Sequence, residues 1–117
     1  MTPEGKVKAT VKALLKSQGV YYFMPVSNGM GAMGVFDIVC CCNGVFLGVE
    51  CKSDAKKPPT PLQTRNARIA QNAGAVVFLA HADNVTDLAR TIDQIKGDPH
   101  GATQYSFWPA DRAGEDN

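Results

Sequence analysis

Residues 34–52 read GVFDIVCCCNGVFLGVECK, and this stretch carries the strongest structural signal in the sequence. Two runs rich in β-branched and aromatic residues flank Asn43-Gly44, which is the strongest short-range signal for a β-hairpin with a two-residue turn. If Asn43 and Gly44 form the turn, Cys42 faces Val45, and the register of the whole hairpin follows outward from that pair. The sequence therefore predicts two antiparallel strands whose facing residues can be named in advance.

Two carboxylates face each other across this predicted hairpin. The register sets Asp37 opposite Glu50, with Cβ atoms roughly 4.5–5.5 Å apart, and Lys52 projects from the same face two residues further on. Like charges directly opposite one another weaken a hairpin, and a divalent cation held by oxygen ligands is the simplest way to offset their repulsion. The alternative is an exposed, splayed pair at the open end of the hairpin. The flanking runs are apolar on both faces, however, as in a covered sheet.

Helices and strands alternate in the sequence on either side of the hairpin. Helix stops are expected at Gly19, Gly74 and Gly97, and Pro25 favours a sheet edge for the strand that contains it. In chain order we expect a helix over 2–18, a strand over 20–26, the hairpin, a helix from 60 to 73, a buried strand over 75–81 and a helix that begins after Asp83 or Asn84. This order predicts an α/β fold.

Length and composition limit the class of protein. The chain has 117 residues, 44% of them hydrophobic and 20% charged, which is typical of one globular domain. It has neither an apolar run of the roughly 20 residues that span a bilayer nor a visible signal peptide. The four cysteines (40, 41, 42 and 51) include no C-x-x-C spacing, so a zinc site or a disulfide framework is not expected. We therefore predict a cytoplasmic protein with no membrane partner.

The net charge of +1 conceals an uneven distribution. Residues 1–74 hold nine Lys and Arg against four acids, whereas residues 97–117 hold one Arg against four acids. A basic first part suits a polyanionic partner, and a merely solvated basic surface is the alternative.

Two further polar residues have both a structural and a functional interpretation. Glu4 falls within the apolar stripe of the first helix, beside Val7 and Val11, but a first-turn acid also stabilises the helix dipole. Gln63 completes a Thr-x-x-Gln capping box with Thr60, and it can also serve a site. Both interpretations stay open for each residue.

Joined together, these residues resemble the PD-(D/E)XK nuclease superfamily, and within it the virus-type replication-repair nuclease (VRR-NUC) domains. The matching features are an early helical Glu (Glu4), a Gly-x-x-Asp strand ending at Asp37, a Glu-x-Lys strand at Glu50 and Lys52, and Gln63 after a proline/threonine loop. The resemblance covers about residues 2–95. Phe36 departs from it, because the family usually has proline there. The implied fold is a restriction-endonuclease-like αβββαβ(α) core with a central mixed sheet flanked by helices. It would occupy residues 1–97 and leave 98–117 as a partly flexible extension.

The resemblance also implies an activity and a set of site residues. It implies a metal-dependent, structure-selective DNA endonuclease that acts on branched DNA such as four-way junctions or flaps. Asp37, Glu50 and the backbone carbonyl of Cys51 would hold Mg²⁺ or Mn²⁺, and Glu4 would complete the metal shell, directly or through a water. Lys52 would orient or help deprotonate the attacking water, and Gln63 would position Lys52 or that water. Phosphate contacts are expected from Lys8, Lys12, Lys56, Lys57, Arg65 and Arg68.

Several alternatives remain at this stage. A restriction-type nuclease or a Holliday-junction resolvase would share the core, and a non-catalytic nucleic-acid-binding module could keep the fold without the chemistry. A cysteine-based enzyme is disfavoured because neither His is near the cysteines in sequence and strand cysteines usually pack as small hydrophobes. Family members of this size are expected to form homodimers, here through apolar segments at 20–24, 30–36 or 105–108.

Overall fold

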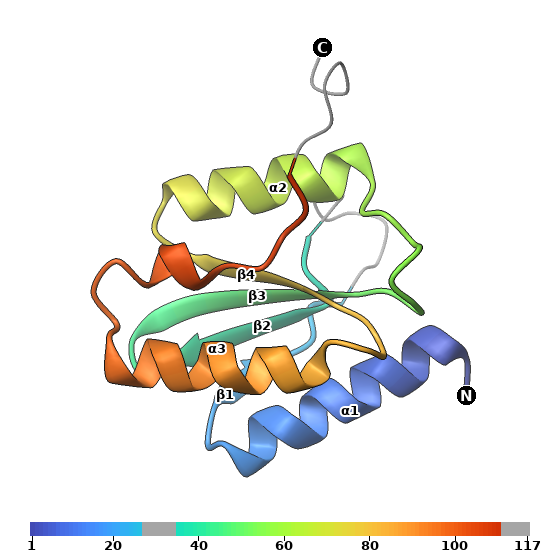
Figure 1. Ribbon diagram of the computed structural model, residues 1–117, viewed down its shortest axis with the longest axis horizontal. Helices are drawn as coiled ribbons and strands as arrows, with labels where there is room; N and C mark the ends of the chain where they lie inside the picture. The colour runs from blue at the N-terminus through green and yellow to red at the C-terminus, as the bar shows by residue number, and fades with distance from the viewer. Residues whose placement is uncertain (27–34, 111–117) are drawn as a thin grey trace.

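The computed structural model describes residues 1–26 and 35–110 of the chain. Its elements follow the predicted order (Figure 1). They are α1 (Pro3–Ser17), β1 (Tyr21–Phe23), β2 (Ile38–Cys42), β3 (Val45–Cys51), α2 (Pro61–Asn72), β4 (Val76–Ala80), α3 (Val85–Gly97) and a short 3-10 helix, η1 (Ala102–Tyr105). The glycine of the Gly-x-x-Asp motif and most of the apolar segment at 30–36 lie outside the described residues.

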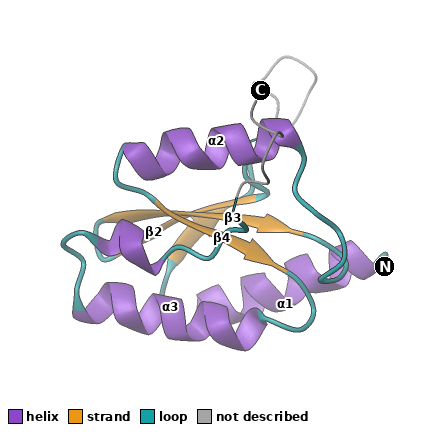
Figure 2. Cartoon of the chain, turned by 45° about the horizontal axis from the view of Figure 1, so that its top comes forward, coloured by secondary structure: helices purple, strands orange, loops and turns teal. Residues whose placement is uncertain are grey.

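One mixed sheet forms the centre of the molecule. Its strand order is β1-β2-β3-β4, with antiparallel pairing between the first three strands and parallel pairing between β3 and β4. Helix α2 makes the crossover between the parallel strands and covers one face, while α1 and α3 cover the other face (Figures 1 and 2). The α/β fold with a mixed sheet flanked by helices is confirmed. β1 lies at the sheet edge, as Pro25 predicts.

The hairpin has the predicted turn and register. Asn43 and Gly44 both adopt positive φ, at 50° and 82°, which is the backbone conformation of the favoured hairpin turn. Cys42 pairs with Val45, and the ladder continues to the pair between Ile38 and Val49. The predicted facing pair of Asp37 and Glu50 needs a correction, because β2 begins only after Asp37 and the ladder ends one step before it.

The helix caps agree with the sequence in two of three helices. Thr2 Oγ1 accepts a hydrogen bond from the N–H of Gly5 at 3.0 Å, and Thr60 and Gln63 form a complete capping box. Asn84 precedes α3 as expected, but its side chain does not cap the helix. It is buried, accepts from the N–H of His81 at 2.8 Å and donates to the carbonyl of Leu79 at 2.8 Å, so it fixes the end of β4 instead.

The two faces of the sheet are packed unequally. The main core lies on the side of α1 and α3, where buried residues such as Leu15, Phe78 and Ile92 belong to one continuous cluster. The α2 side holds a much smaller buried cluster of Phe36, Ala67 and Val77. The less densely packed α2 side is also the side on which Glu50 lies, because side chains alternate along β3 and Glu50 follows the core-facing Val49.

Residues after α3 pair with the free edge of β4. The backbone of Phe107 donates to the carbonyl of Val77 at 2.9 Å and accepts from the N–H of Leu79 at 2.8 Å. The indole N–H of Trp108 donates to Thr64 Oγ1 of α2 at 3.3 Å. Phe107 therefore forms an isolated parallel bridge with Phe78 at this edge of the sheet. The predicted domain boundary at residue 97 stays a prediction, and residues 111–117 of the predicted extension lie outside the described part of the chain.

Candidate functional site

Asp37 lies where the hairpin ladder ends. At this point its side chain, and not its backbone, forms the hydrogen bond to β3. Its Oδ2 accepts a hydrogen bond from the backbone N–H of Cys51 at 2.8 Å. The next N–H along β3, that of Lys52, donates to the carbonyl of Ala80 at 2.8 Å on the opposite side. Successive peptide groups of a strand point to opposite neighbours. The end of β3 is therefore held by β4 on one side and by the Asp37 carboxylate on the other.

Glu50 is the one acid that is buried among the residues that the structure describes. Its residue is only 2% exposed, and its Oε2 is buried with no hydrogen-bond partner. Burial raises the pKa of Glu50 to about 9, helped by the neighbouring Asp37 carboxylate, while Lys52 and the backbone at Cys51 act in the opposite direction. Without a cation beside it, Glu50 is therefore a neutral carboxylic acid at neutral pH.

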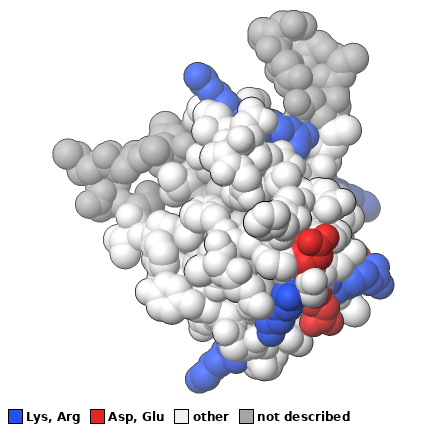
Figure 3. Space-filling view, turned by 90° about the vertical axis from the view of Figure 1, so that its left-hand side faces the viewer, with Lys and Arg blue, Asp and Glu red and all other residues white. Residues whose placement is uncertain are grey.

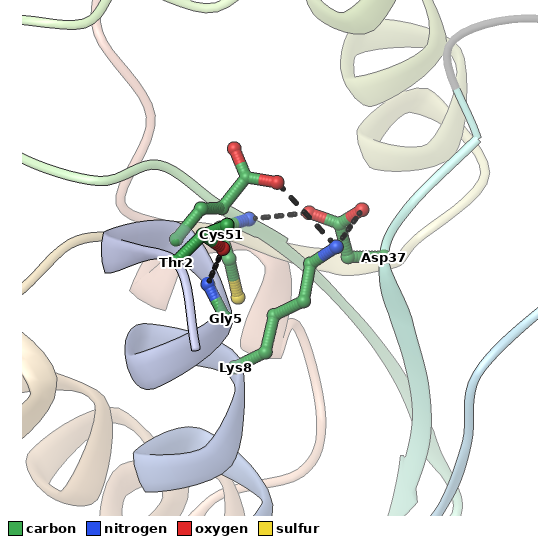
Figure 4. A network of polar contacts seen from close by, with 6 residues as sticks. Thr2, Gly5, Lys8, Asp37 and Cys51 are labelled. Carbon is green, nitrogen blue, oxygen red and sulfur yellow. Dashed lines mark hydrogen bonds and ion pairs between the residues drawn. The ribbon is translucent and has the colours of Figure 1, made fainter.

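A lysine from the first helix reaches the same site. Lys8 Nζ lies 3.6 Å from Asp37 Oδ1 and 3.4 Å from Glu4 Oε2 (Figure 4). Burial lowers the pKa of Lys8, but the Asp37 and Glu4 carboxylates outweigh it, and the pKa ends above its ordinary value. The sequence predicts Lys8 as a phosphate contact on a basic ridge, whereas the structure shows its ammonium group paired with two carboxylates, one of which is Asp37.

Lys52 and the unpredicted His81 occupy neighbouring strand ends. The parallel register sets Cys51 beside Ala80, and the hydrogen bond from the Lys52 N–H to Ala80 continues that pairing by one step. His81 follows Ala80 directly, and its Nδ1 accepts from the N–H of Asp83 at 3.2 Å. No sequence signal points to His81, because only the parallel pairing of β3 with β4 brings it next to Lys52.

The structure assigns Glu4 and Gln63 structural contacts. Glu4 lies in the first turn of α1, its side chain is 45% exposed, and Lys8 lies between it and Asp37. Gln63 Oε1 accepts from the backbone N–H of Thr60 at 2.9 Å, which confirms its capping interpretation. Their predicted catalytic roles stay predictions.

The remaining basic residues of the predicted phosphate-binding set fall into two groups. Lys56 and Lys57 are exposed in the loop between β3 and α2, and Arg65 is exposed on α2. Lys12 has no ion-pair partner within residues 1–26 and 35–110. Arg68 differs from them, because its guanidinium donates to Gln71 Oε1 and to the carbonyl of Pro109, both at 2.8 Å. Arg68 thus ties the segment that follows Trp108 to α2.

The oxygen atoms of the site fit a hard divalent cation. Within the described ranges, no group of three or more His, Cys, Asp or Glu side chains is placed to hold a metal. Mg²⁺, in contrast, usually binds proteins through one or two carboxylates and keeps several waters. Asp37 and Glu50 supply two carboxylates, and the carbonyl of Cys51 points to the same side of β3 as its N–H. The unpartnered Oε2 of Glu50 is the oxygen that such a cation would satisfy.

Three of the four cysteines are buried in the sheet. Cys40, Cys42 and Cys51 are buried, and burial raises the pKa of Cys40 and of Cys51 to about 12. A thiol with so high a pKa is protonated at neutral pH and is a poor nucleophile. The expectation that the chain is not a cysteine-based enzyme stays a prediction.

The fold of the chain is similar to that of a solved structure. No protein-family model matches it, and neither does any curated protein. A solved structure described as a "VRR_NUC domain" is similar to it with a TM-score of 0.62, over 84% of this chain and 98% of that chain, at 24% sequence identity. The fold that the sequence predicts is thereby confirmed. Among the described residues, no helix is long and apolar enough to cross a membrane, and the predicted cytoplasmic location stays a prediction.

Proposed function

We propose that this chain is a Mg²⁺- or Mn²⁺-dependent nuclease that hydrolyses phosphodiester bonds in DNA. The observation that carries the proposal is the buried Glu50 carboxyl, whose Oε2 has no partner although Asp37 lies beside it. A buried polar atom without a partner costs free energy, and the structure offers Glu50 Oε2 no hydrogen-bond partner among the described residues. A divalent cation between Glu50 and Asp37 would remove that cost and give the pair a function.

The residues of the site divide the reaction among themselves. Asp37, Glu50 and the Cys51 carbonyl would hold the cation, which when bound supplies water activation and neutralisation of phosphoryl charge. Lys52 lies one residue beyond the carbonyl ligand, at the end of β3. Its ammonium group would orient the attacking water and stabilise the negative charge that develops on the phosphoryl oxygens.

Exposed lysines beside the site suit a nucleic-acid backbone. Lys56 and Lys57 lie in the loop that directly follows Lys52, and their side chains are exposed. Contacts to phosphate supply affinity without base specificity and weaken steeply as salt rises. DNA that is recognised by the shape of its backbone, such as branched DNA, matches this arrangement better than DNA that is recognised by its base sequence.

Cleavage of a labelled substrate panel tests the proposal. Single-stranded, linear duplex, flap and four-way junction DNA, with an RNA strand beside them, would be incubated with Mg²⁺, Mn²⁺ or EDTA. Wild type should cleave DNA only with metal, and Asp37→Asn should lose cleavage, whereas Asp93→Asn, at an exposed acid on α3, should retain it. Metal-independent cleavage, or full activity in Asp37→Asn, would refute the proposed site. DNA binding without any cleavage would favour the non-catalytic binding module instead.

We further propose that the chain forms a homodimer that cuts branched DNA symmetrically. Tyr21 pairs with Cys41, and Cys41 pairs with Phe46, so these three residues form a row across β1, β2 and β3. Tyr21 is 70% exposed and Phe46 44% exposed, which leaves apolar rings open to solvent. Apolar residues grouped in this way on a surface are typical of interaction sites.

Light scattering at micromolar concentration tests the dimer. Wild type should have twice the mass of one chain, and Tyr21→Glu should shift it toward the monomer. Ile69→Glu, at an apolar residue that is 59% exposed on α2, is the matched control and should leave the mass unchanged. A wild-type mass of 12.5 kDa, together with equal cleavage rates on linear duplex and junction, would exclude both the dimer and the branched substrate.

A further inference from the structure

The candidate site already contains a cation of its own. Lys8 Nζ contacts Asp37 Oδ1 and Glu4 Oε2, and Asp37 Oδ2 is held by the N–H of Cys51 (Figure 4). Both oxygens of Asp37 therefore have partners. The ammonium group stands at the oxygen of Asp37 that the Cys51 N–H leaves available.

A divalent cation and this ammonium group cannot both keep that oxygen in the same geometry. Mg²⁺ binds carboxylate oxygens at about 2.0–2.1 Å, whereas Lys8 Nζ is 3.6 Å from Asp37 Oδ1. Two cations on one oxygen would lie a few Å apart, where like charges repel strongly in a partly buried environment. One of them must move.

Lys8 is the one that can move without disturbing the fold. Its side chain is 28% exposed, it stands on a flexible four-carbon stem, and its second partner Glu4 is 45% exposed in the first turn of α1. Partly exposed ion pairs of this kind contribute little to stability, so releasing Asp37 costs little. The helix position keeps the released ammonium group beside the site.

We propose that Lys8 is an exchangeable cation of this site, which neutralises Asp37 while metal is absent and, once a divalent cation takes Asp37, turns to a phosphate of the nucleic-acid substrate. The inference rests on the proposed nuclease function and adds to it a residue with two successive partners. It gives Lys8 a different role from Lys12, which lies one turn further along α1 and has no ion pair in the described part of the chain.

Calorimetric titration of the full chain with Mn²⁺ alone, without nucleic acid, tests whether Lys8 competes with the metal for Asp37. Lys8→Gln removes the competing charge, so its Kd for Mn²⁺ should fall about tenfold, a modest share of the repulsion between neighbouring charges. Lys12→Gln is the matched control and should keep the wild-type Kd. Lys8→Arg keeps the charge and should not bind Mn²⁺ more tightly than wild type. Thermal melts in EDTA establish that each variant is folded.

Cleavage kinetics at saturating Mn²⁺ test the second partner. Lys8→Gln should raise KM for DNA or lower kcat, and the salt dependence of kcat/KM should lose about one unit of slope, because one phosphate contact is gone. A purely structural ion pair would change neither the metal affinity nor the salt slope.

The two proposals fail in different ways. If folded Lys8→Gln binds Mn²⁺ no more tightly than wild type, or if Lys8→Arg tightens as much as Lys8→Gln, the exchange is refuted while the nuclease function stands. If wild type binds no Mn²⁺ and cleaves nothing, the proposed function is refuted and the exchange with it.

Discussion

The two ends of strand β3 differ in the number of charged side chains around them. At the beginning of β3, beside the turn at Gly44, the molecule presents a mostly uncharged surface (Figure 3). A hollow of about 550 Å³ lies there, lined by residues that include Phe46, Ala73 and Pro99. At its other end stand Glu50 and Lys52, and there Asp37 and Lys8 converge from other elements. One strand thus joins a mostly uncharged end to an end where several charged side chains meet.

The residues at the hairpin end stabilise the fold, whereas the residues at the carboxylate end do not all do so. The hairpin end satisfies local rules, because its turn residues adopt the conformations that the strand twist prefers. The carboxylate end violates one, because Glu50 is buried with an unpartnered oxygen. Such violations cluster at functional sites. Changes at the hairpin end should therefore alter stability or the proposed dimer without touching the metal site, and changes at the carboxylate end should alter metal binding and cleavage.

The largest effect is expected at Lys52. Lys52→Ala should lower kcat by a factor on the order of 10²–10³, because a positioned charge that acts on the transition state is lost. Its Kd for Mn²⁺ should change little, since Lys52 is not a proposed ligand. Lys57→Ala, in the exposed loop that follows, should affect mainly KM and serves as the control. Single-turnover cleavage at saturating metal makes the measurement, and a wild-type kcat in Lys52→Ala would remove Lys52 from the mechanism.

The next effect is a pH dependence of stability in the metal-free protein. The pKa of Glu50 is raised to about 9 in the folded state, so its contribution to stability is fully present below its unfolded pKa near 4.5. That contribution is lost as pH rises toward 9, by up to about 1.4 kcal/mol per pH unit. Glu50→Gln stays neutral, and its melting temperature should fall less between pH 5 and pH 9 in EDTA. Parallel melting curves for the two proteins would contradict the assignment of a buried neutral acid.

Two glycines of the same hairpin should respond differently to alanine. A Cβ on Gly48 would lie 2.5 Å from the ring of the buried Phe36, so Gly48→Ala should destabilise by about 1–3 kcal/mol. Because Phe36 precedes Asp37, the metal-induced rise in melting temperature should shrink as well. A Cβ on Gly44 would meet open space, but the φ of 82° is a backbone conformation that alanine disfavours. Gly44→Ala should therefore lower the stability by about 1 kcal/mol. Denaturant unfolding with and without Mn²⁺ compares them, and a full metal shift in Gly48→Ala would uncouple Phe36 from the site.

The smallest effect separates capping from catalysis at Gln63. Thr60→Ala and Gln63→Ala each remove one half of the capping box, and each should cost about 1 kcal/mol of stability. If Gln63 only caps α2, both variants should keep the same kcat at a temperature where they are folded. A kcat that falls in Gln63→Ala alone would restore the predicted catalytic role.

Local sequence signals predicted the hairpin and the helix starts because their causes are local. Asn43-Gly44 selects the turn, the turn sets the register, and Thr60 with Gln63 closes a cap within four residues. Phe36, a departure from the family pattern, is accommodated because Gly48 leaves room for its ring on β3. These features depend on residues that are neighbours in the chain or in the hairpin.

The rest of the site depends on contacts between distant segments. The reach of Lys8 to Asp37, the position of His81 beside Lys52 and the pairing of Phe107 with β4 all depend on how the layers pack. Arg68 illustrates the limit, because a helix-surface arginine gives no sign in sequence that Pro109 will accept its hydrogen bond. The sequence pattern identified Asp37 as a site residue. It could not show that Lys8 contacts Asp37, because that contact depends on how α1 packs against the sheet.

The number of protons released when the metal binds tests whether Glu50 is a metal ligand. If the buried, neutral Glu50 becomes a metal ligand, it must lose its proton, because metal ligands bind in their deprotonated form. Calorimetric titration of the full chain with Mn²⁺ at pH 7.5, in two buffers of different ionisation enthalpy, counts that proton. We expect about one proton released per cation in wild type, and none in Glu50→Gln, whose metal binding should be weak. Tight binding that releases no proton would mean that the cation binds away from Glu50.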